Sequence, residues 1–176
     1  MKAIRIHEFG GPDVLELDEI EIPKPAEDEG LIKVYATSIN PVDWKIREGL
    51  RKDKFPCNLP LTLGWDVSGV IEQAGNHVRN LSIGDEVYSR PDPNRDGTYA
   101  EYVVVKANQV GLKPRSIDHI QAAAVPLAGL TAWQGLFKHG QLQKGQRVLI
   151  HAASGGVGTF AVQFARWKGA YVIGTA

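Results

Sequence analysis

The chain has 176 residues, 43% of them hydrophobic, and its 20 Lys and Arg balance 20 Asp and Glu to a net charge of zero. The length supports one buried core or a core and part of a second, and the balanced charge argues against nucleic acid or an anionic membrane as partner. The single cysteine, Cys57, excludes an internal disulfide and any paired-cysteine metal site, so we expect a structural thiol.

Residues 1 to about 113 are expected to be β-rich, because short apolar and β-branched runs alternate with turn signals. Turn signals include Gly10-Gly11-Pro12-Asp13, Pro23-Lys24-Pro25 and Gly84-Asp85. The expected strands lie within residues 3–6, 14–22, 32–35, 67–71, 87–88 and 99–105. This spacing is typical of an all-β barrel or sandwich.

The pattern becomes helical from about Ile117, where Ile120, Ala123, Leu127 and Leu130 recur at helical spacing. We therefore predict a β-rich domain at residues 1–120 and the start of an α/β domain at residues 121–176.

A glycine-rich turn follows the apolar run Val148-Leu149-Ile150 and consists of Ser154, Gly155, Gly156, Val157 and Gly158. Ala153 stands where such a turn usually has its first glycine. Glycines at these positions allow a tight turn and close approach of the backbone to a pyrophosphate, which free N–H groups at a helix start attract. The turn predicts the phosphate-binding half of a dinucleotide site, in preference to a mere tight turn.

A helix is expected after this turn, because its apolar residues form one stripe: Val157, Phe160, Ala161, Phe164 and Ala165. Gly169 is placed for a left-handed C-terminal cap, and residues 170–174 resume a strand-like run. Strand, turn, helix and strand make a βαβ unit. Such a fold needs more strands and a ribose-binding residue beyond Ala176, so we expect the N-terminal portion of a longer protein.

Four further segments carry a family resemblance: Asn40-Pro41-Val42-Asp43, the run from Gly64-Trp65-Asp66 to Val78, Gly84-Asp85-Glu86-Val87, and Gly97-Thr98-Tyr99-Ala100-Glu101-Tyr102. Together with the glycine turn they resemble the medium-chain dehydrogenase/reductase superfamily, and most of all its zinc-independent quinone oxidoreductase branch. The resemblance covers the whole chain. It implies a GroES-like barrel followed by a Rossmann domain, here truncated, with NADPH in the cleft between the two.

The resemblance also implies site residues. Asn40 and Trp44 would border the nicotinamide and acceptor pocket, and Lys45 matches a position that reaches the cofactor near its ribose or phosphate. Thr131 and Ala132 match positions against the nicotinamide. A short helix on the barrel rim is an equally good interpretation of Lys45, and core packing is the alternative for residues 131 and 132.

No metal is expected. Alcohol dehydrogenases of the superfamily hold catalytic zinc through residues that correspond to Asn40, Trp65 and Ala128, and none of these three can supply a thiolate or imidazole. The histidines, His7, His77, His119, His139 and His151, show no ligand spacing.

Two other motifs are interpreted as coincidences. Tyr102 and Lys106 fit the YxxxK pattern of short-chain dehydrogenases, but the β-branched residues between them predict a strand rather than the helix that the motif needs. Ser154 with His151 lacks the GxSxG elbow of a nucleophile and more plausibly serves a phosphate.

We therefore expect an NADPH-dependent oxidoreductase that transfers hydride to a quinone or an α,β-unsaturated carbonyl without a metal. The alternative is a non-catalytic structural or interaction protein that retains the fold. With no signal-type segment and no membrane-length apolar run, we expect a cytoplasmic protein without membrane or nucleic-acid partners, whose full-length form could be a homodimer. The sequence does not specify which acceptor is reduced or whether NADPH is preferred to NADH.

Overall fold

The structure is a computed structural model that describes residues 1–54 and 58–176. The chain divides into two compact units, Met1–Ala124 and Val125–Ala176, each described by itself below. Cys57, expected to be a structural thiol, lies outside the described residues.

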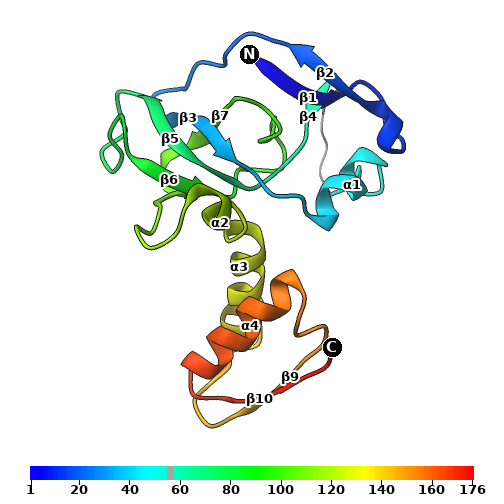
Figure 1. The fold of residues 1–176 in the computed structure, drawn as a ribbon, viewed down its shortest axis with the longest axis vertical. Helices are drawn as coiled ribbons and strands as arrows, with labels where there is room; N and C mark the ends of the chain where they lie inside the picture. Colours follow the sequence, from blue (N-terminus) through cyan, green and yellow to red (C-terminus); the bar gives the residue numbers. More distant parts are fainter. Residues whose placement is uncertain (55–57) are drawn as a thin grey trace. The chain divides into compact units, whose positions relative to one another are not determined.

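Unit 1 consists of two antiparallel sheets (Figure 1). The first has the order β2-β1-β4, with β1 at Lys2–Ile6, β2 at Leu15–Glu19 and β4 at Leu61–Thr62. The second has the order β7-β3-β5-β6-β8. Its strands are β3 (Glu29–Ala36), β5 (Val67–Ala74), β6 (Glu86–Ser89), β7 (Tyr102–Lys106) and β8 (Val110–Leu112). One bridge, Ala3 to Ala100, joins β1 to the segment before β7.

The core of unit 1 forms because inward residues of the second sheet are β-branched or aliphatic at alternate positions. Its buried members are Ile32, Val67, Ile71, Leu81, Val87, Val103, Val105 and Ala107. The pairing of β3 with β5 shifts register between Leu31 and Ile32 and again between Val34 and Ala36. Such bulges bend a strand, which is how a sheet curves toward a barrel.

Two expected strands are shorter than predicted. In the run from Val14 to Ile22, the strand β2 covers only Leu15–Glu19, because Val14 ends a 3₁₀ turn, η1 (Pro12–Val14), in which Pro12 favours the turn conformation. The run from Tyr99 to Val105 enters the sheet only at Tyr102, and Tyr99 instead bonds outside the sheet. The short strands β4 and β8 were not expected.

Short helices complete unit 1: α1 (Pro41–Arg47), η2 (Ala107–Gln109) and α2 (His119–Ala123). The helical pattern expected from Ile117 onward is interrupted after Ala123, and α3 (Pro126–Trp133) starts anew at a proline in unit 2. Proline lacks an N–H, so it suits the first position of a helix and not its interior.

Unit 2 contains the expected βαβ arrangement. β9 (Arg147–Ile150) and β10 (Tyr171–Gly174) pair in parallel, and α4 (Gly156–Trp167) connects them (Figure 1). A π-helical turn, η3 (Gln134–His139), extends α3. Gly169 has φ of +81°, the left-handed cap predicted for this position. The expected fold class, a β-rich domain followed by one βαβ unit, is confirmed.

The core of unit 2 lies beneath the apolar stripe of α4. Its buried members are Ala132, Leu142, Ile150, Ala161 and Ala165. Two stripe residues predicted from the sequence, Ala161 and Ala165, are therefore in this core, and Phe160 and Phe164 pack against it. No helix among the described residues is long and apolar enough to span a bilayer.

Candidate cofactor and substrate site

The glycine turn places an uncapped helix start at the surface of unit 2. Residues 154–157 are exposed, and Gly155 is the N-cap of α4, with no side chain to bond the first N–H groups. The first turn of a helix has no internal acceptors for its N–H groups, which also carry the positive end of the helix dipole. The geometry suits an anion such as a phosphate.

Gly156 and Gly158 have different environments. A Cβ added at Gly156 would meet no atom within 4 Å, so this backbone is open to a ligand. A Cβ at Gly158 would lie 2.1 Å from the Ala152 carbonyl oxygen, so this glycine is required for the helix to pack on the turn. Ala152 itself has φ of +50°, a left-handed conformation that alanine rarely adopts.

The two candidate residues of α3 face different surroundings. Thr131 is exposed, and its hydroxyl donates to the Leu127 carbonyl oxygen at 2.7 Å. That bond uses the only hydroxyl hydrogen, so Thr131 can offer a ligand an acceptor and not a donor. Ala132 is 2% exposed and belongs to the core of unit 2, which leaves its methyl group unavailable to a ligand. The side chain of Ala132 therefore packs in the core, as the alternative interpretation of this residue predicts.

In unit 1, α1 starts at Asn40, an N-cap residue in extended conformation that is followed by Pro41 at the first helical position. The backbone N–H of Asn40 donates to Asp43 Oδ2 at 2.6 Å, which is the return bond of a capping box. The short helix considered for this segment is therefore present.

Trp44 and Lys45 lie on α1. Trp44 is 40% exposed, a high value for a tryptophan, and Lys45 Nζ lies 5.4 Å from the centroid of its ring. A cation near an exposed aromatic face suits a ligand that combines a planar ring with negative charge. Both residues are thus accessible to a ligand of unit 1.

Asn40 is anchored by two partners from outside its helix. Its side-chain Nδ2 donates to Asp66 Oδ2 at 2.8 Å and to Ser38 Oγ at 3.1 Å, and Ser38 Oγ donates to the same carboxylate oxygen at 2.5 Å. Asp66 is fully buried and directly precedes β5. Burial lowers the pKa of half-buried Arg90, and the negative charges of Asp92 and Asp66 oppose that shift.

Asp43 is a second buried carboxylate beside this network. It is 3% exposed, and its Oδ2 also accepts a hydrogen bond from Tyr99 Oη at 2.7 Å. Burial raises the pKa of Asp43, and bonds from Asn40 and Tyr99 oppose that shift. Burial and the negative charge of Asp43 in turn raise the pKa of Tyr99 well above its usual range.

The family resemblance equates three positions of this chain with the zinc ligands of alcohol dehydrogenases, and these positions hold other groups. Trp65 is fully buried, Ala128 is 7% exposed in unit 2, and the amide nitrogen of Asn40 already bonds Asp66. An indole, a methyl group and an amide supply no zinc ligand of the usual kind.

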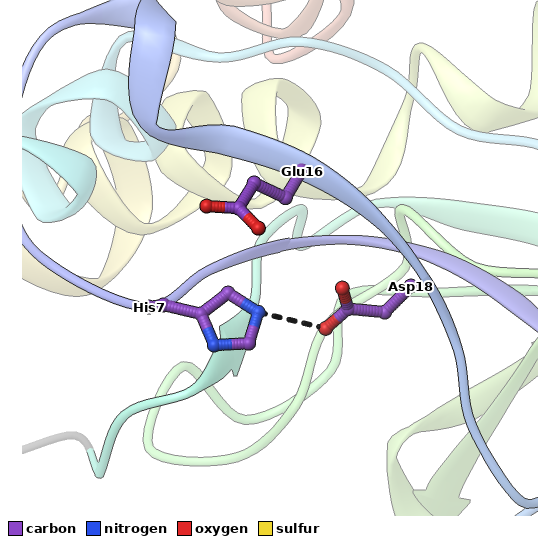
Figure 2. A group of neighbouring side chains, drawn as sticks. All are labelled: His7, Glu16 and Asp18. Carbon is purple, nitrogen blue, oxygen red and sulfur yellow. Dashed lines mark hydrogen bonds and ion pairs between the residues drawn. The ribbon is translucent and has the colours of Figure 1, made fainter.

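One grouping of metal-ligand side chains lies elsewhere in unit 1. His7, Glu16 and Asp18 approach one another across the pairing of β1 with β2, and His7 Nε2 lies 2.9 Å from Asp18 Oδ2 (Figure 2). Arg5 Nη1 also lies 3.7 Å from Asp18. A guanidinium beside the carboxylate opposes a second cation, so the grouping is adequately explained as cross-strand pairing. Sequence spacing did not reveal it, because the hairpin register decides which side chains meet.

The motifs interpreted as coincidences do not form catalytic arrangements. Tyr102 and Lys106 are the two ends of strand β7, so the helical spacing that a YxxxK motif needs is absent. His151 Nδ1 lies 3.4 Å from Thr175 Oγ1, an interaction that does not involve Ser154.

Comparison with known proteins agrees with this arrangement. Residues 26–115 match the alcohol dehydrogenase GroES-like domain family. A quinone oxidoreductase of Sus scrofa is 42% identical in an alignment of 177 positions that covers 100% of this chain and 53% of the relative. The mitochondrial NAD(P)H oxidoreductase RTN4IP1 of Mus musculus is 44% identical in an alignment of 194 positions that covers 98% of this chain and 48% of the relative.

A solved structure is similar throughout the chain. The Escherichia coli quinone oxidoreductase complexed with NADPH matches with a TM-score of 0.88 and 34% sequence identity, over 100% of this chain and 52% of that one. The chain spans about half the length of the relatives it matches.

These similarities, together with the fold of unit 1 and the βαβ unit, identify the class of protein. It is an oxidoreductase with a GroES-like domain. The chain belongs to the medium-chain dehydrogenase/reductase superfamily, in its quinone oxidoreductase-like family. The resemblance inferred from Asn40-Pro41-Val42-Asp43 and the other motifs is confirmed.

Three residues around Asn40 were not assigned roles from the sequence: Ser38, Asp66 and Tyr99. One signal was available, since Asp66 is a charged residue at the start of an apolar run that predicts a buried strand. A buried carboxylate needs partners, but the sequence does not say which ones.

Proposed function

We propose that this chain carries the NADPH-binding turn and the acceptor-side residues of an oxidoreductase that reduces a quinone or an α,β-unsaturated carbonyl without a metal. The open helix start at Gly155 and Gly156 is the observation that carries the proposal. The NADPH complex of the related Escherichia coli enzyme supports the choice of cofactor.

The residues of the turn fit a pyrophosphate. Free N–H groups of residues 156–158 would bond the phosphate oxygens, exposed Ser154 would add a donor beside them, and exposed Val157 would lie next to the ligand. Gly155 leaves the helix start without a capping side chain that would compete with the ligand. Thr131 would accept a hydrogen bond from the nicotinamide carboxamide, while Ala132 would support it from the core.

Asn40, Trp44 and Lys45 would serve the reacting end in unit 1. Lys45 supplies a positive charge for the cofactor's ribose or phosphate, and Trp44 offers a flat apolar face to a ring. Bound NADPH supplies a hydride, and the protein's part is to orient the acceptor and exclude water. A conjugated acceptor delocalises the negative charge that it gains, which makes a Lewis acid dispensable.

The donor set supports a reaction without zinc. The amide of Asn40, the indole of Trp65 and the methyl group of Ala128 stand where zinc-dependent relatives have ligands. We expect chelators to leave the activity of the complete protein unchanged, and chelator-sensitive activity that zinc restores would contradict the proposal.

Substitution of Gly156 tests the cofactor site. Gly156→Val adds a side chain into open space, so folding should be retained while close approach of the pyrophosphate is blocked. We expect NADPH binding to the complete protein, followed by cofactor fluorescence, to weaken by at least about tenfold, or roughly 1.4 kcal/mol. Gly135→Val, at a second glycine with open space around it, is the matched control. Unchanged NADPH binding in Gly156→Val, or no binding in the parent, would favour a structural protein that only retains the fold.

We further propose a cytoplasmic protein that acts on small molecules and that forms a homodimer in its complete form. Cell fractionation and light scattering of the complete protein test these two points.

A further inference from the structure

The amide of Asn40 has its nitrogen toward Asp66, which is the orientation that an ionised carboxylate requires. Asp66 Oδ2 can only accept hydrogen bonds when ionised, so the amide nitrogen and not the amide oxygen of Asn40 must face it. Ser38 donates its single hydroxyl hydrogen to the same Asp66 oxygen, and its lone pairs accept from Asn40. The three side chains form a closed triangle.

The triangle can be formed with one of the two hydrogens on Asn40 Nδ2. Its two acceptors, Ser38 Oγ and Asp66 Oδ2, are 2.5 Å apart, so the directions to them from Nδ2 differ by about 50°. The two N–H bonds of a planar amide diverge more than twice as widely. One hydrogen that points between the two acceptors bonds both, and the second N–H then points away from the triangle.

Burial makes the anchor rigid. Asp66 is fully buried, and its backbone carbonyl accepts a further hydrogen bond from Thr37 Oγ1 at 2.7 Å, which holds the segment before α1 against the start of β5. Asn40 itself is only half-buried, and its backbone is held at the N-cap by Asp43. The amide is thus bonded to a fully buried carboxylate while its own residue remains partly exposed.

We propose that Asp66 and Ser38 are positioning residues that hold the second N–H of Asn40 as a donor for a carbonyl oxygen of a bound ligand. The ligand part rests on the proposed function. Both the electron acceptor and the nicotinamide carboxamide contain a carbonyl oxygen, and a preorganised donor of this kind is most effective where negative charge develops on that oxygen.

The anchoring is tested on the 176-residue chain without any cofactor. In ¹⁵N spectra we expect the two side-chain amide hydrogens of Asn40 to be strongly inequivalent, one exchanging with solvent at least about tenfold more slowly than the other. Exposed Asn76 is the internal control, with both hydrogens exchanging fast. Ser38→Ala should accelerate the slow hydrogen of Asn40, and Ser38→Thr, which keeps the hydroxyl group, should not. Two fast hydrogens at Asn40 in the parent would overturn the anchor.

Swapping the residues at positions 40 and 66 distinguishes a donor role of Asn40 from a purely structural role. Asn40→Asp sets two carboxylates together and should lower the melting temperature by roughly 4 to 10 °C. The double variant Asn40→Asp with Asp66→Asn restores an amide–carboxylate pair, so stability should return to within about 2 °C of the parent. It leaves no side-chain N–H at position 40, so kcat/KM of the complete protein should remain at least about tenfold lower.

The pattern of losses identifies the carbonyl. A fall in kcat with unchanged NADPH affinity assigns the donor to the electron acceptor, and a fall in NADPH affinity assigns it to the carboxamide. Recovery of full activity together with stability in the double variant would show a purely structural network and overturn the proposal. A parent protein without reductase activity would overturn the ligand role and the proposed function, while the exchange data still decide the anchor on their own.

Discussion

Tyr99 Oη donates a hydrogen bond of 2.7 Å to Asp43 Oδ2 and so joins α1 to a segment 56 residues further along the chain. The same carboxylate oxygen accepts the Asn40 N–H at the start of the helix. Gly64, with φ of +94°, makes this possible, because a Cβ there would lie 2.4 Å from the Tyr99 ring. One buried carboxylate therefore holds the candidate acceptor-side helix in place.

The pKa of Asp43 predicts a specific pH dependence. Burial raises that pKa above the ordinary value of 3.8, so on rising pH the unfolded chain loses this proton before the folded protein does. The contribution of Asp43 to stability is therefore greatest at pH values below its ordinary pKa, and it falls as pH rises through the raised pKa of the folded protein. We expect the free energy of unfolding of Asp43→Asn, minus that of the parent, to increase between about pH 4 and 7 in denaturant titrations. Exposed Asp13→Asn should give a flat difference, and a slope of opposite sign at Asp43 would contradict the assignment.

Glu29 should behave in the opposite way. It is 6% exposed, and its Oε1 pairs with Arg95 Nη1. The hydrogen bond from Arg95 lowers the pKa of Glu29 below the ordinary 4.5, although burial opposes that shift. The stabilisation from Glu29 is present at pH values above its ordinary pKa, and it is lost as pH falls through the lowered pKa of the folded protein. Arg95→Met should cost about 1–2 kcal/mol at pH 7, since Arg95 is partly exposed, and less at pH 4. Arg115→Met, at an exposed arginine, is the control, and an equal loss at both pH values for Arg95→Met would be inconsistent with the pair.

Gly158 should be a stability position, unlike Gly156. A methyl group at Gly158 would collide with the Ala152 carbonyl, so Gly158→Ala should destabilise unit 2 by about 1–3 kcal/mol. Gly156→Ala meets open space in a helix and should leave stability unchanged or raise it by up to about 1 kcal/mol. Hydrogen exchange of the α4 amides measures both. Equal effects at the two positions would show that the turn differs from this description.

Lys45 should contribute charge to cofactor binding. Lys45→Met is expected to weaken NADPH binding by roughly 3- to 10-fold at low salt, with a smaller difference at 0.5 M salt, because salt screens exposed charges. Lys52→Met is the matched control, since Lys52 Nζ also lies over an aromatic ring, that of Phe9, at 4.1 Å. Equal losses in the two variants would indicate a general charge effect. Titration of the complete protein by cofactor fluorescence provides the measurement.

Local patterns determined much of the fold from the sequence alone. The stripe of α4, the cap at Gly169 and the helix beginning after Asn40 depend on residues within a turn or two of one another, and all three are present. The glycine turn was recognisable for the same reason. The apolar spacing of the helical region did not indicate a break, whereas Pro126 starts a separate helix, α3.

The partners of buried polar groups were decided only by tertiary structure. Asp66 meets Asn40 across 26 residues, and Tyr99 meets Asp43 across 56, contacts that no periodicity encodes. Sheet register likewise brought His7 to Asp18, and packing put the methyl group of Ala132 into a core. Sequence periodicity reports which face of an element is buried, whereas the identity of a buried group's partner depends on how distant strands and loops meet. The sequence alone therefore determined the class of protein. The anchoring of the Asn40 amide was decided only by the tertiary structure.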